Sequence, residues 1–346
     1  MKVIIDPADD ILYKSFYVFG LEKLFGRNNV SYNGRYFSEL SVTARNTKSM
    51  RFVLVNDDRQ SRYVIECNDS YKINKELYDW CDVYGSVNAN FSKTPKEFHE
   101  KLVALCPSFG VRCWNVPQTV YHALCNYHGS GSGFKKFLGK HKRMLQRVAY
   151  DCYFSPIEET SSPMAENTYV FFLSTLWYSD EWNKNDEGLN ARRSNFIRAC
   201  KELDGVEFEG GLVSQGKDRS SEELFADCLC EGVAMKEWME KTKRSALVFN
   251  TPAFWDCHGW KLGEYLAMGK AIVSTPLSND LPAPLEHGKN IHFVENDKEA
   301  MKDAIQYIVT HPEYRMKLEQ GAREYWDKYG TPRASLRLLG IDNGQK

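Results

Sequence analysis

The sequence predicts an α/β protein with two domains, each a parallel sheet covered by helices. The chain has 346 residues, and domains average about 150 residues, so two are expected. Short apolar runs alternate with segments of helical periodicity, which is the pattern of a parallel sheet covered on both faces. Residues 155–167 (SPIEETSSPMAEN) have the composition of a linker. We therefore expect an N-terminal domain at 1–160, a C-terminal domain at 161–330, and a tail at 331–346 that crosses back to the first domain.

The first half is the less regular part of the pattern. Its β-rich runs are Lys2–Asp6, Arg51–Asn56 and Arg62–Glu66, its clearest helical segment is Ile11–Phe25, and short strands or turns are expected at Cys81–Val87 and Leu105–Val111. These elements indicate an α/β structure for the first half, but they do not predict the order of its strands.

The second half is more regular. Continuous apolar runs, typical of strands buried on both faces, occur at Thr168–Leu176, Ser245–Asn250, Lys270–Ser274 and Asn290–Val294, with Val206–Phe208 leading into Gly210 and Gly211. Helices are expected at Asn195–Leu203, Ser221–Cys230 and Gly263–Met268. Asn296 and Glu299 have the spacing of a capping box before an apolar face made by Met301, Ala304, Ile305, Ile308 and Val309. Pro312 suits the first turn of a last long helix that ends near Gly330.

Composition excludes several classes of protein. Hydrophobic residues make up 42% of the chain and the formal net charge is -1, whereas disorder requires low hydrophobicity and high charge. No apolar run approaches the roughly 20 residues of a membrane-spanning helix. The N-terminus becomes acidic at Asp9 and Asp10, unlike a signal peptide, so we expect a cytoplasmic location. The ten cysteines include no C-x2-C pair, which favours reduced thiols over a structural zinc site.

The charge is unevenly distributed. Residues 1–160 hold 22 basic and 17 acidic residues, whereas residues 161–346 hold 23 and 29. Such a division predicts different partners for the two halves.

The common nucleotide motifs are absent. No strand leads into G-x-G-x-x-G, and there is no G-x4-G-K-[ST] loop, no G-x-S-x-G and no H-E-x-x-H. The segment Gly129–Gly133 (GSGSG) is either a flexible loop or an anion cradle.

The most informative stretch is residues 245–294. A strand ends at Asn250, a loop carries Asp256 and Gly259, and a helix follows whose first turn is expected to hold Glu264. The N-terminus of a helix at the carboxyl end of a parallel sheet binds anions through free N–H groups and the helix dipole. Lys261 adds positive charge there, and an acidic residue can accept hydrogen bonds from a ribose diol.

This stretch resembles the donor-binding domain of GT-B glycosyltransferases, especially the retaining "group 1" enzymes. The family pattern E-x7-E, helix, Gly and strand appears as Asp256-x7-Glu264 followed by Gly269 and Ala271–Val273. The run from Leu285 to Val294 (LEHGKNIHFV) resembles the family's later glycine turn, and His311–Arg315 (HPEYR) resembles its "dPe-x-r" helix start. The match covers residues 245–330. It implies two Rossmann-like α/β/α domains that face each other across a cleft.

The resemblance also implies roles for individual residues. Glu264 would bind the ribose of a nucleotide-sugar, and Asp256 replaces the family's first glutamate, beside the donor sugar, with a shorter carboxylate. Both are our catalytic candidates, and Asn250, Gly259 and Lys261 complete this part of the binding site. The alternative interpretation is that Asp256 caps a turn and that Glu264 is an ordinary acid of a first helical turn.

The diphosphate of such a donor needs cations. Arg192 and Arg193, and Lys217 after the Gly210–Gly211 pair, are the candidates, with solvated surface charge as the alternative for each. There is no D-x-D motif, and the resemblance implies catalysis without a metal or another cofactor, by cations and the helix dipole.

The first domain would bind the acceptor. Asp9 or Asp10 stands where the family has a glycine-rich loop, and either is a candidate general base. Residues 135–147 (KKFLGKHKRMLQR) carry six basic residues and no acid. This segment is either a solvated helix face or a peripheral contact with anionic membrane, and nucleic-acid binding is the least favoured reading.

These observations predict a glycosyltransferase that moves a sugar from a nucleotide-sugar to a glycan or lipid-linked acceptor in polysaccharide or lipopolysaccharide biosynthesis, with retention of configuration. The alternatives are a nucleotide-sugar epimerase of the same fold and a catalytically inactive nucleotide-sugar-binding partner subunit. The replacement of glutamate by Asp256 favours the last of these.

Overall fold

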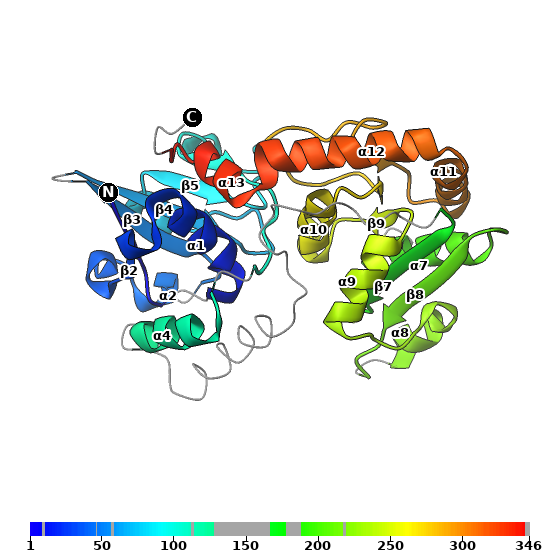
Figure 1. Ribbon diagram of the computed structural model, residues 1–346, viewed down its shortest axis with the longest axis horizontal. Helices are drawn as coiled ribbons and strands as arrows, with labels where there is room; N and C mark the ends of the chain where they lie inside the picture. Colours follow the sequence, from blue (N-terminus) through cyan, green and yellow to red (C-terminus); the bar gives the residue numbers. More distant parts are fainter. Residues whose placement is uncertain are drawn as a thin grey trace. The chain divides into compact units, whose positions relative to one another are not determined.

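The computed structural model describes residues 1–8, 11–45, 47–56, 59–111, 114–127, 167–177, 188–216 and 219–342. The chain divides into two compact α/β units (Figure 1). Unit 1 comprises Met1–Glu159, Asn279–Pro284 and Asp327–Lys346, and unit 2 comprises Thr160–Ser278 and Leu285–Trp326. The predicted α/β class is confirmed in both units.

Unit 1 contains a six-stranded mixed sheet with the order β2-β1-β3-β4-β5-β6. Its strands are β1 (Lys2–Ile5), β2 (Val30–Tyr32), β3 (Met50–Asn56), β4 (Arg59–Glu66), β5 (Val83–Ser86) and β6 (Leu102–Ala104). All neighbours pair in parallel except β3, which runs antiparallel to both β1 and β4. Asn56 pairs with Arg59, and two intervening residues suffice for a hairpin, whereas a parallel connection needs a dozen or more. This sheet is therefore mixed rather than wholly parallel.

The helices of unit 1 come from both ends of the chain. They are α1 (Ile11–Phe25), α2 (Val42–Arg45), α3 (Lys75–Trp80), α4 (Val116–Tyr127) and α13 (Pro332–Leu338). Helix α13 packs on α1. A Cβ atom at Gly20 would lie 3.0 Å from both Leu336 Cδ1 and Pro332 Cβ, so glycine allows this close approach. The expected strand or turn at Leu105–Val111 has no regular structure, because the strand precedes it as β6.

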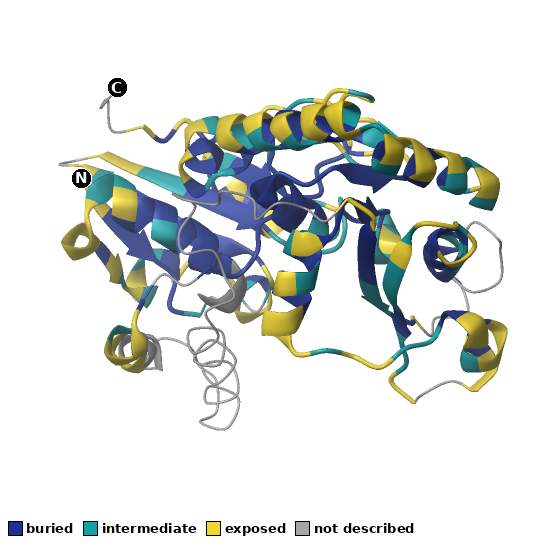
Figure 2. Cartoon of the chain, turned by 45° about the vertical axis from the view of Figure 1, so that its right-hand side comes forward, coloured by how far each residue is buried: buried dark blue, intermediate teal, exposed yellow. Residues whose placement is uncertain are grey.

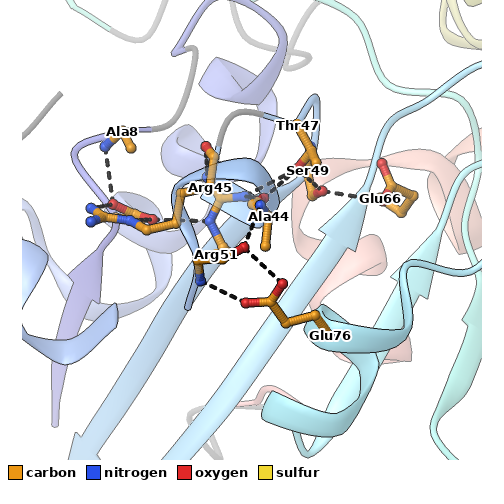
Figure 3. Close-up of polar contacts among 10 residues, drawn as sticks. Ala8, Ala44, Arg45, Thr47, Ser49, Arg51, Glu66 and Glu76 are labelled. Atoms are coloured by element: carbon orange, nitrogen blue, oxygen red, sulfur yellow. Dashed lines mark hydrogen bonds and ion pairs between the residues drawn. The ribbon is translucent and has the colours of Figure 1, made fainter. Parts of the chain in front are cut away.

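A buried polar cluster joins β1, α2 and β3 of unit 1 (Figure 3). Asp6, directly after β1, accepts hydrogen bonds from Arg51 Nε (3.0 Å) and Arg45 NH2 (2.6 Å). The side chains of Asp6 and Arg51 are completely buried. Burial alone would raise the pKa of Asp6, but the hydrogen bond from Arg45 and the charge of Arg51 outweigh it and hold that pKa below its usual value. Asp6 also accepts from the Ala8 N–H and so fixes the start of the following loop.

The strands of unit 2 are β7 (Tyr169–Thr175), β8 (Glu207–Val213), β9 (Val248–Asn250), β10 (Ile272–Ser274) and β11 (His292–Phe293). They form two parallel sheets, in which β7 pairs with β8, and β10 pairs with β9 and β11. The two sheets meet at β7 and β9, because Ala246 N donates to Tyr169 O (2.7 Å) and the rings of Phe172 and Phe249 lie 5.6 Å apart. The second contact is three residues further along both segments, so β9 runs beside β7 in the same direction. The chain thus starts at β7, moves to β8 on one side, and returns to β9 on the other.

Helices α7 (Leu189–Lys201), α8 (Arg219–Leu224), α9 (Met235–Arg244), α10 (Trp260–Met268), α11 (Lys298–Thr310) and α12 (Pro312–Tyr325) complete unit 2. Three expectations were wrong in detail. Helix α7 begins six residues before Asn195, the Ser221–Cys230 segment forms α8 and a short 3-10 helix (Ala226–Cys228), and the N-cap of α11 is Asp297. Asp297 accepts from Ala300 N (2.8 Å), while Asn296 accepts from the Asn195 side chain (3.2 Å).

The cores follow the apolar runs of the sequence. Strands of both units are buried over most of their length, and the exposed residues concentrate on the outer faces of helices such as α12 (Figure 2). In unit 2, Phe196 stacks on Phe249 with ring centroids 4.3 Å apart, which packs α7 directly onto β9. This packing fixes the N-terminus of α7 near the carboxyl end of the sheet.

Candidate functional site

The candidate site lies at the carboxyl ends of β7 and β9 in unit 2, where the order of the strands reverses. In open α/β sheets, ligands bind at this position. Helices α7 and α10 begin there, with Gly188 and Gly259 as their N-cap residues. Glycine has no side chain that could accept a hydrogen bond from the first N–H groups of the helix. By contrast, the side chain of Asp297 caps α11. Two helix N-termini with glycine caps at a switch point form an environment suited to an anion.

Arg193, in the second turn of α7, is one of two cations proposed from the sequence that lie at this edge. It is 7% exposed and donates from NH1 to Thr175 O at the end of β7 (2.8 Å). Burial lowers the pKa of its guanidinium to about 10. Beside it, NH1 of Arg192 is buried without a hydrogen-bond acceptor among the residues that the structure describes.

Lys261, in the first turn of α10, is the second cation. Its ammonium group donates to Leu173 O and lies 5.1 Å from the centre of the Phe172 ring, so it reaches across to β7. Burial and, to a smaller extent, the charge of Arg193 lower its pKa to about 7, and Glu264 opposes both effects. Arg193 and Lys261 therefore lie close enough to influence each other, although they are 68 residues apart in sequence.

Within the described ranges of the chain, no carboxylate forms an ion pair with Arg193 or Lys261, and each donates only to a backbone carbonyl. Buried charges in proteins are normally paired. Two cations without an ion-pair partner among the described residues, beside two helix N-termini, make this edge positive although Glu264 opposes them in part, and an anionic ligand would neutralise it.

The two acidic candidates occupy different environments. Glu264 is 5% exposed and lies in the second turn of α10, because the helix starts at Trp260. The expectation that it lies in the first turn was wrong. Asp256 is partly exposed, at the end of a short 3-10 helix (Phe254–Asp256), with a φ of 58° that is uncommon outside glycine.

The remaining candidates are less closely associated with the cations. Gly259 leaves open space, since an added Cβ would meet only Ala253 Cβ at 3.7 Å. Asn250 donates from its amide to Ser274 Oγ (2.9 Å) and thereby joins β9 to β10, which is a structural contact. Lys217, Asp9, Asp10 and residues 135–147 lie outside the described residues.

Sequence reasoning missed Asn190 and the aromatic residues beside the cations. Asn190 is 1% exposed and bonds to both backbone polar groups of Trp177, with Nδ2 to Trp177 O at 2.7 Å. The ring of Trp177 stacks on that of Phe254. The sequence shows that the loop after β7 and the loop before α10 are rich in tryptophan. It does not show that the two loops are close together, which depends on β9 lying beside β7.

In the parts of the chain that the structure describes, no three His, Cys, Asp or Glu side chains gather closely enough to hold a metal ion. Catalysis without a metal stays a prediction. Among the described helices, none is sufficiently long and apolar to cross a membrane.

The chain is similar in fold to solved structures of glycosyltransferases. One is TarM, with 16% identity, a TM-score of 0.39, and coverage of 54% of this chain and 38% of TarM. A glycosyltransferase from Rickettsia africae shares 14% identity with a TM-score of 0.42 and coverage of 78% and 66%. WaaG, a glycosyltransferase involved in lipopolysaccharide biosynthesis, shares 14% identity with a TM-score of 0.38 and coverage of 81% and 86%.

The chain therefore spans about two fifths of TarM and two thirds of the Rickettsia enzyme. No protein-family model matches the sequence. No curated protein matches it either.

Proposed function

We propose that unit 2 binds a nucleotide-sugar and that the protein is a glycosyltransferase. The observation that carries this proposal is a pair of cations at the carboxyl ends of β7 and β9: Arg193, which is buried, and Lys261, which is partly buried, neither of which forms an ion pair with a carboxylate among the described residues. A diphosphate supplies two adjacent negative charges, which match two convergent cations and two helix N-termini. Binding the diphosphate would restore the charge balance that the free protein lacks.

The same arrangement suits the chemistry of sugar transfer. When the bond between the sugar C1 and the diphosphate oxygen breaks, negative charge develops on the departing β-phosphate. Positive groups already fixed in a site with little water stabilise that charge without reorganisation. Lys261 and Arg193, held by the carbonyls of Leu173 and Thr175, are positioned in advance in this way. The acceptor hydroxyl adds to C1 on the face from which the diphosphate departs, and its proton passes to the departing β-phosphate oxygen, while Lys261 and Arg193 neutralise the remaining negative charge.

The finer assignments belong to the same proposal. Glu264 would accept hydrogen bonds from the ribose, and Asp256 would lie beside the transferred sugar, with retention of configuration. The acceptor, a glycan or lipid-linked glycan of polysaccharide or lipopolysaccharide assembly, would bind to unit 1. Peripheral contact with anionic membrane would use residues 135–147, which are basic.

Glu264→Gln is the direct test of ribose recognition. The variant keeps the shape of the side chain and removes its charge, so affinity for UDP or GDP should fall about 10-fold or more, since hydrogen bonds to charged groups contribute about 1.5–3 kcal/mol. Calorimetry with inorganic pyrophosphate, which has no ribose, should show a smaller change, due only to the effect of the Glu264 charge on the pKa of Lys261. Glu240→Gln, at an exposed position on α9, is the matched control. Unchanged nucleoside diphosphate affinity in Glu264→Gln would remove Glu264 from the site.

The pH dependence of binding tests Lys261. With a pKa of about 7 in the free protein, Lys261 is protonated below that pH and increasingly neutral above it. A diphosphate favours the protonated form, so affinity for a nucleotide-sugar should fall by up to about tenfold per unit as pH rises from 7 towards 9. A nucleotide-sugar is the appropriate probe because its diphosphate has no terminal phosphate that titrates near pH 6. Calorimetry between pH 6 and 9 measures the effect, which Lys261→Met should abolish. A flat profile in the wild type contradicts the assignment of Lys261.

A further inference from the structure

Three aromatic rings lie in contact with one another beside the candidate site. The rings of Trp177 and Phe254 lie nearly parallel, at 12°, with centroids 5.2 Å apart, and Phe254 contacts Trp255 at 4.5 Å. Trp255 is 56% exposed and Trp177 is 37% exposed. We refer to these three residues as the aromatic surface. Large apolar side chains that are exposed together, rather than singly, commonly mark a binding site.

The backbone holds both ends of this surface in place. The Asn190 side chain accepts from Trp177 N (3.1 Å) and donates to Trp177 O (2.7 Å), which fixes the loop after β7 to the first turn of α7. At the other end, Ala253 N donates to Cys257 O (2.8 Å) and Asp256 N to Ala253 O (3.0 Å), so the loop before α10 is closed by its own hydrogen bonds. The aromatic surface is therefore formed before any ligand arrives.

Trp255 occupies a backbone conformation that a bulky residue rarely adopts. Its φ is 55° and its ψ is 34°, in the left-handed region, and Asp256 follows with a φ of 58°. Glycine adopts these angles readily, whereas a side chain with a Cβ is strained there. The burial that Trp255 gains in return is small, because more than half of it is exposed. Strain of this kind concentrates at ligand sites, where the surrounding structure imposes it.

We propose that the aromatic surface binds a pyranose ring of the carbohydrate substrate through the apolar C–H face of the sugar. This inference rests on the proposed function for its position next to a nucleotide-sugar site. Sites for small ligands combine aromatic walls with a few polar groups that fix orientation. The carboxylate of Asp256, which follows Trp255 directly and is partly exposed, accepts hydrogen bonds from several donors and so suits the hydroxyl groups at the sugar's edge. The pyranose belongs either to the acceptor glycan or to the transferred sugar of the donor.

Trp255→Gly is the decisive variant. Glycine suits the φ of 55°, so the melting temperature should stay the same or rise, whereas a structural role for Trp255 would lower it. Binding to an array of hexose and N-acetylhexosamine oligosaccharides should fall about tenfold, as expected for the loss of an aromatic contact. Trp255→Tyr should keep part of the binding. Tyr307→Ala, which removes an exposed aromatic residue of α11, should leave it unchanged.

Calorimetry with UDP, GDP and the corresponding nucleotide-sugars completes the test. If the ring belongs to the donor, Trp255→Gly should lower affinity for the nucleotide-sugar and spare the nucleoside diphosphate. An equal loss for both ligands means that Trp255 stacks on the base and overturns the proposal. It is also overturned if Trp255→Gly changes neither glycan binding nor the affinity difference between nucleotide-sugar and nucleoside diphosphate. Failure of the wild type to bind any nucleoside diphosphate would instead contradict the proposed function.

Discussion

Lys261→Met should bind nucleoside diphosphates about 10- to 100-fold more weakly than the wild type, without a loss of stability. The ammonium group of Lys261 has no carboxylate partner among the described residues, and its hydrogen bond goes to Leu173 O. A charge-assisted hydrogen bond to phosphate contributes about 1.5–3 kcal/mol, which corresponds to this range of affinity. Methionine fills a similar volume and removes the cost of keeping an uncompensated charge away from water, so the melting temperature should not fall.

The matching variant of the second cation and a surface control sharpen this experiment. Arg193→Met should show a similar loss, and the double variant should lose less than the sum of the two in free energy if both contact one diphosphate. Lys236→Met, at a 70% exposed lysine on α9, is the control and should bind as the wild type does. Calorimetry with UDP and GDP measures all four proteins. Wild-type affinity in Lys261→Met and Arg193→Met would exclude this edge of the sheet as the diphosphate site.

Asp6→Asn should lower the free energy of unfolding of unit 1 by about 3–5 kcal/mol. Breaking a buried ion pair leaves the other charge buried and uncompensated, and the guanidinium of Arg51 has no exposed surface. The variant also weakens the hydrogen bond from Arg45 and the contact with Ala8 N that fixes the loop after β1. Hydrogen exchange of the amides in β1 and β3 reports the stability of this unit directly.

Two further variants distinguish the buried pair from surface charge. Asp69→Asn removes an exposed partner of Lys48 and should change stability by less than about 1 kcal/mol. Asp6→Leu combined with Arg51→Met removes both charges and should recover much of the loss. The wild type should lose stability as pH falls through the lowered pKa of Asp6, and Asp6→Asn should not show this step. Equal stability of Asp6→Asn and the wild type would show that the ion pair of Asp6 and Arg51 contributes nothing to the free energy of unfolding.

The sequence identified β7, β9 and β10 because they are largely or wholly buried and read as apolar runs, whereas β8 and β11 are only partly buried. It also proposed Arg193 and Lys261 as binding residues, each after such a strand and near the start of a helix, and their role stays a prediction. It could not show that the two side chains approach each other. That proximity depends on β9 lying beside β7, a contact between residues far apart in the chain.

The errors arose where long-range contacts or weak local signals decide the structure. Helix α10 begins at Trp260 after a glycine, without the Ser, Thr, Asp or Asn that indicates an N-cap, so its start was placed too late. Asn296 and Asp297 are both suitable N-cap residues for α11. The side chain of Asn296 accepts a hydrogen bond from Asn195, and Asp297 caps the helix. The short connection between β3 and β4 predicts an antiparallel hairpin. The expectation of a wholly parallel sheet overlooked this signal.

The packing of α13 on α1 has a consequence for synthesis of the chain. Domains commonly fold in order as they emerge from the ribosome, the N-terminal one first. Here the surface of α1 around Gly20 is covered by Pro332 and Leu336, and Gly85 of β5 is approached by Leu339. Folding of unit 1 can therefore be completed only after residues more than 300 positions beyond Gly20 have been translated. By then the segments of unit 2 are already available. Its first residues are among the first to be translated, and their burial is among the last to be completed.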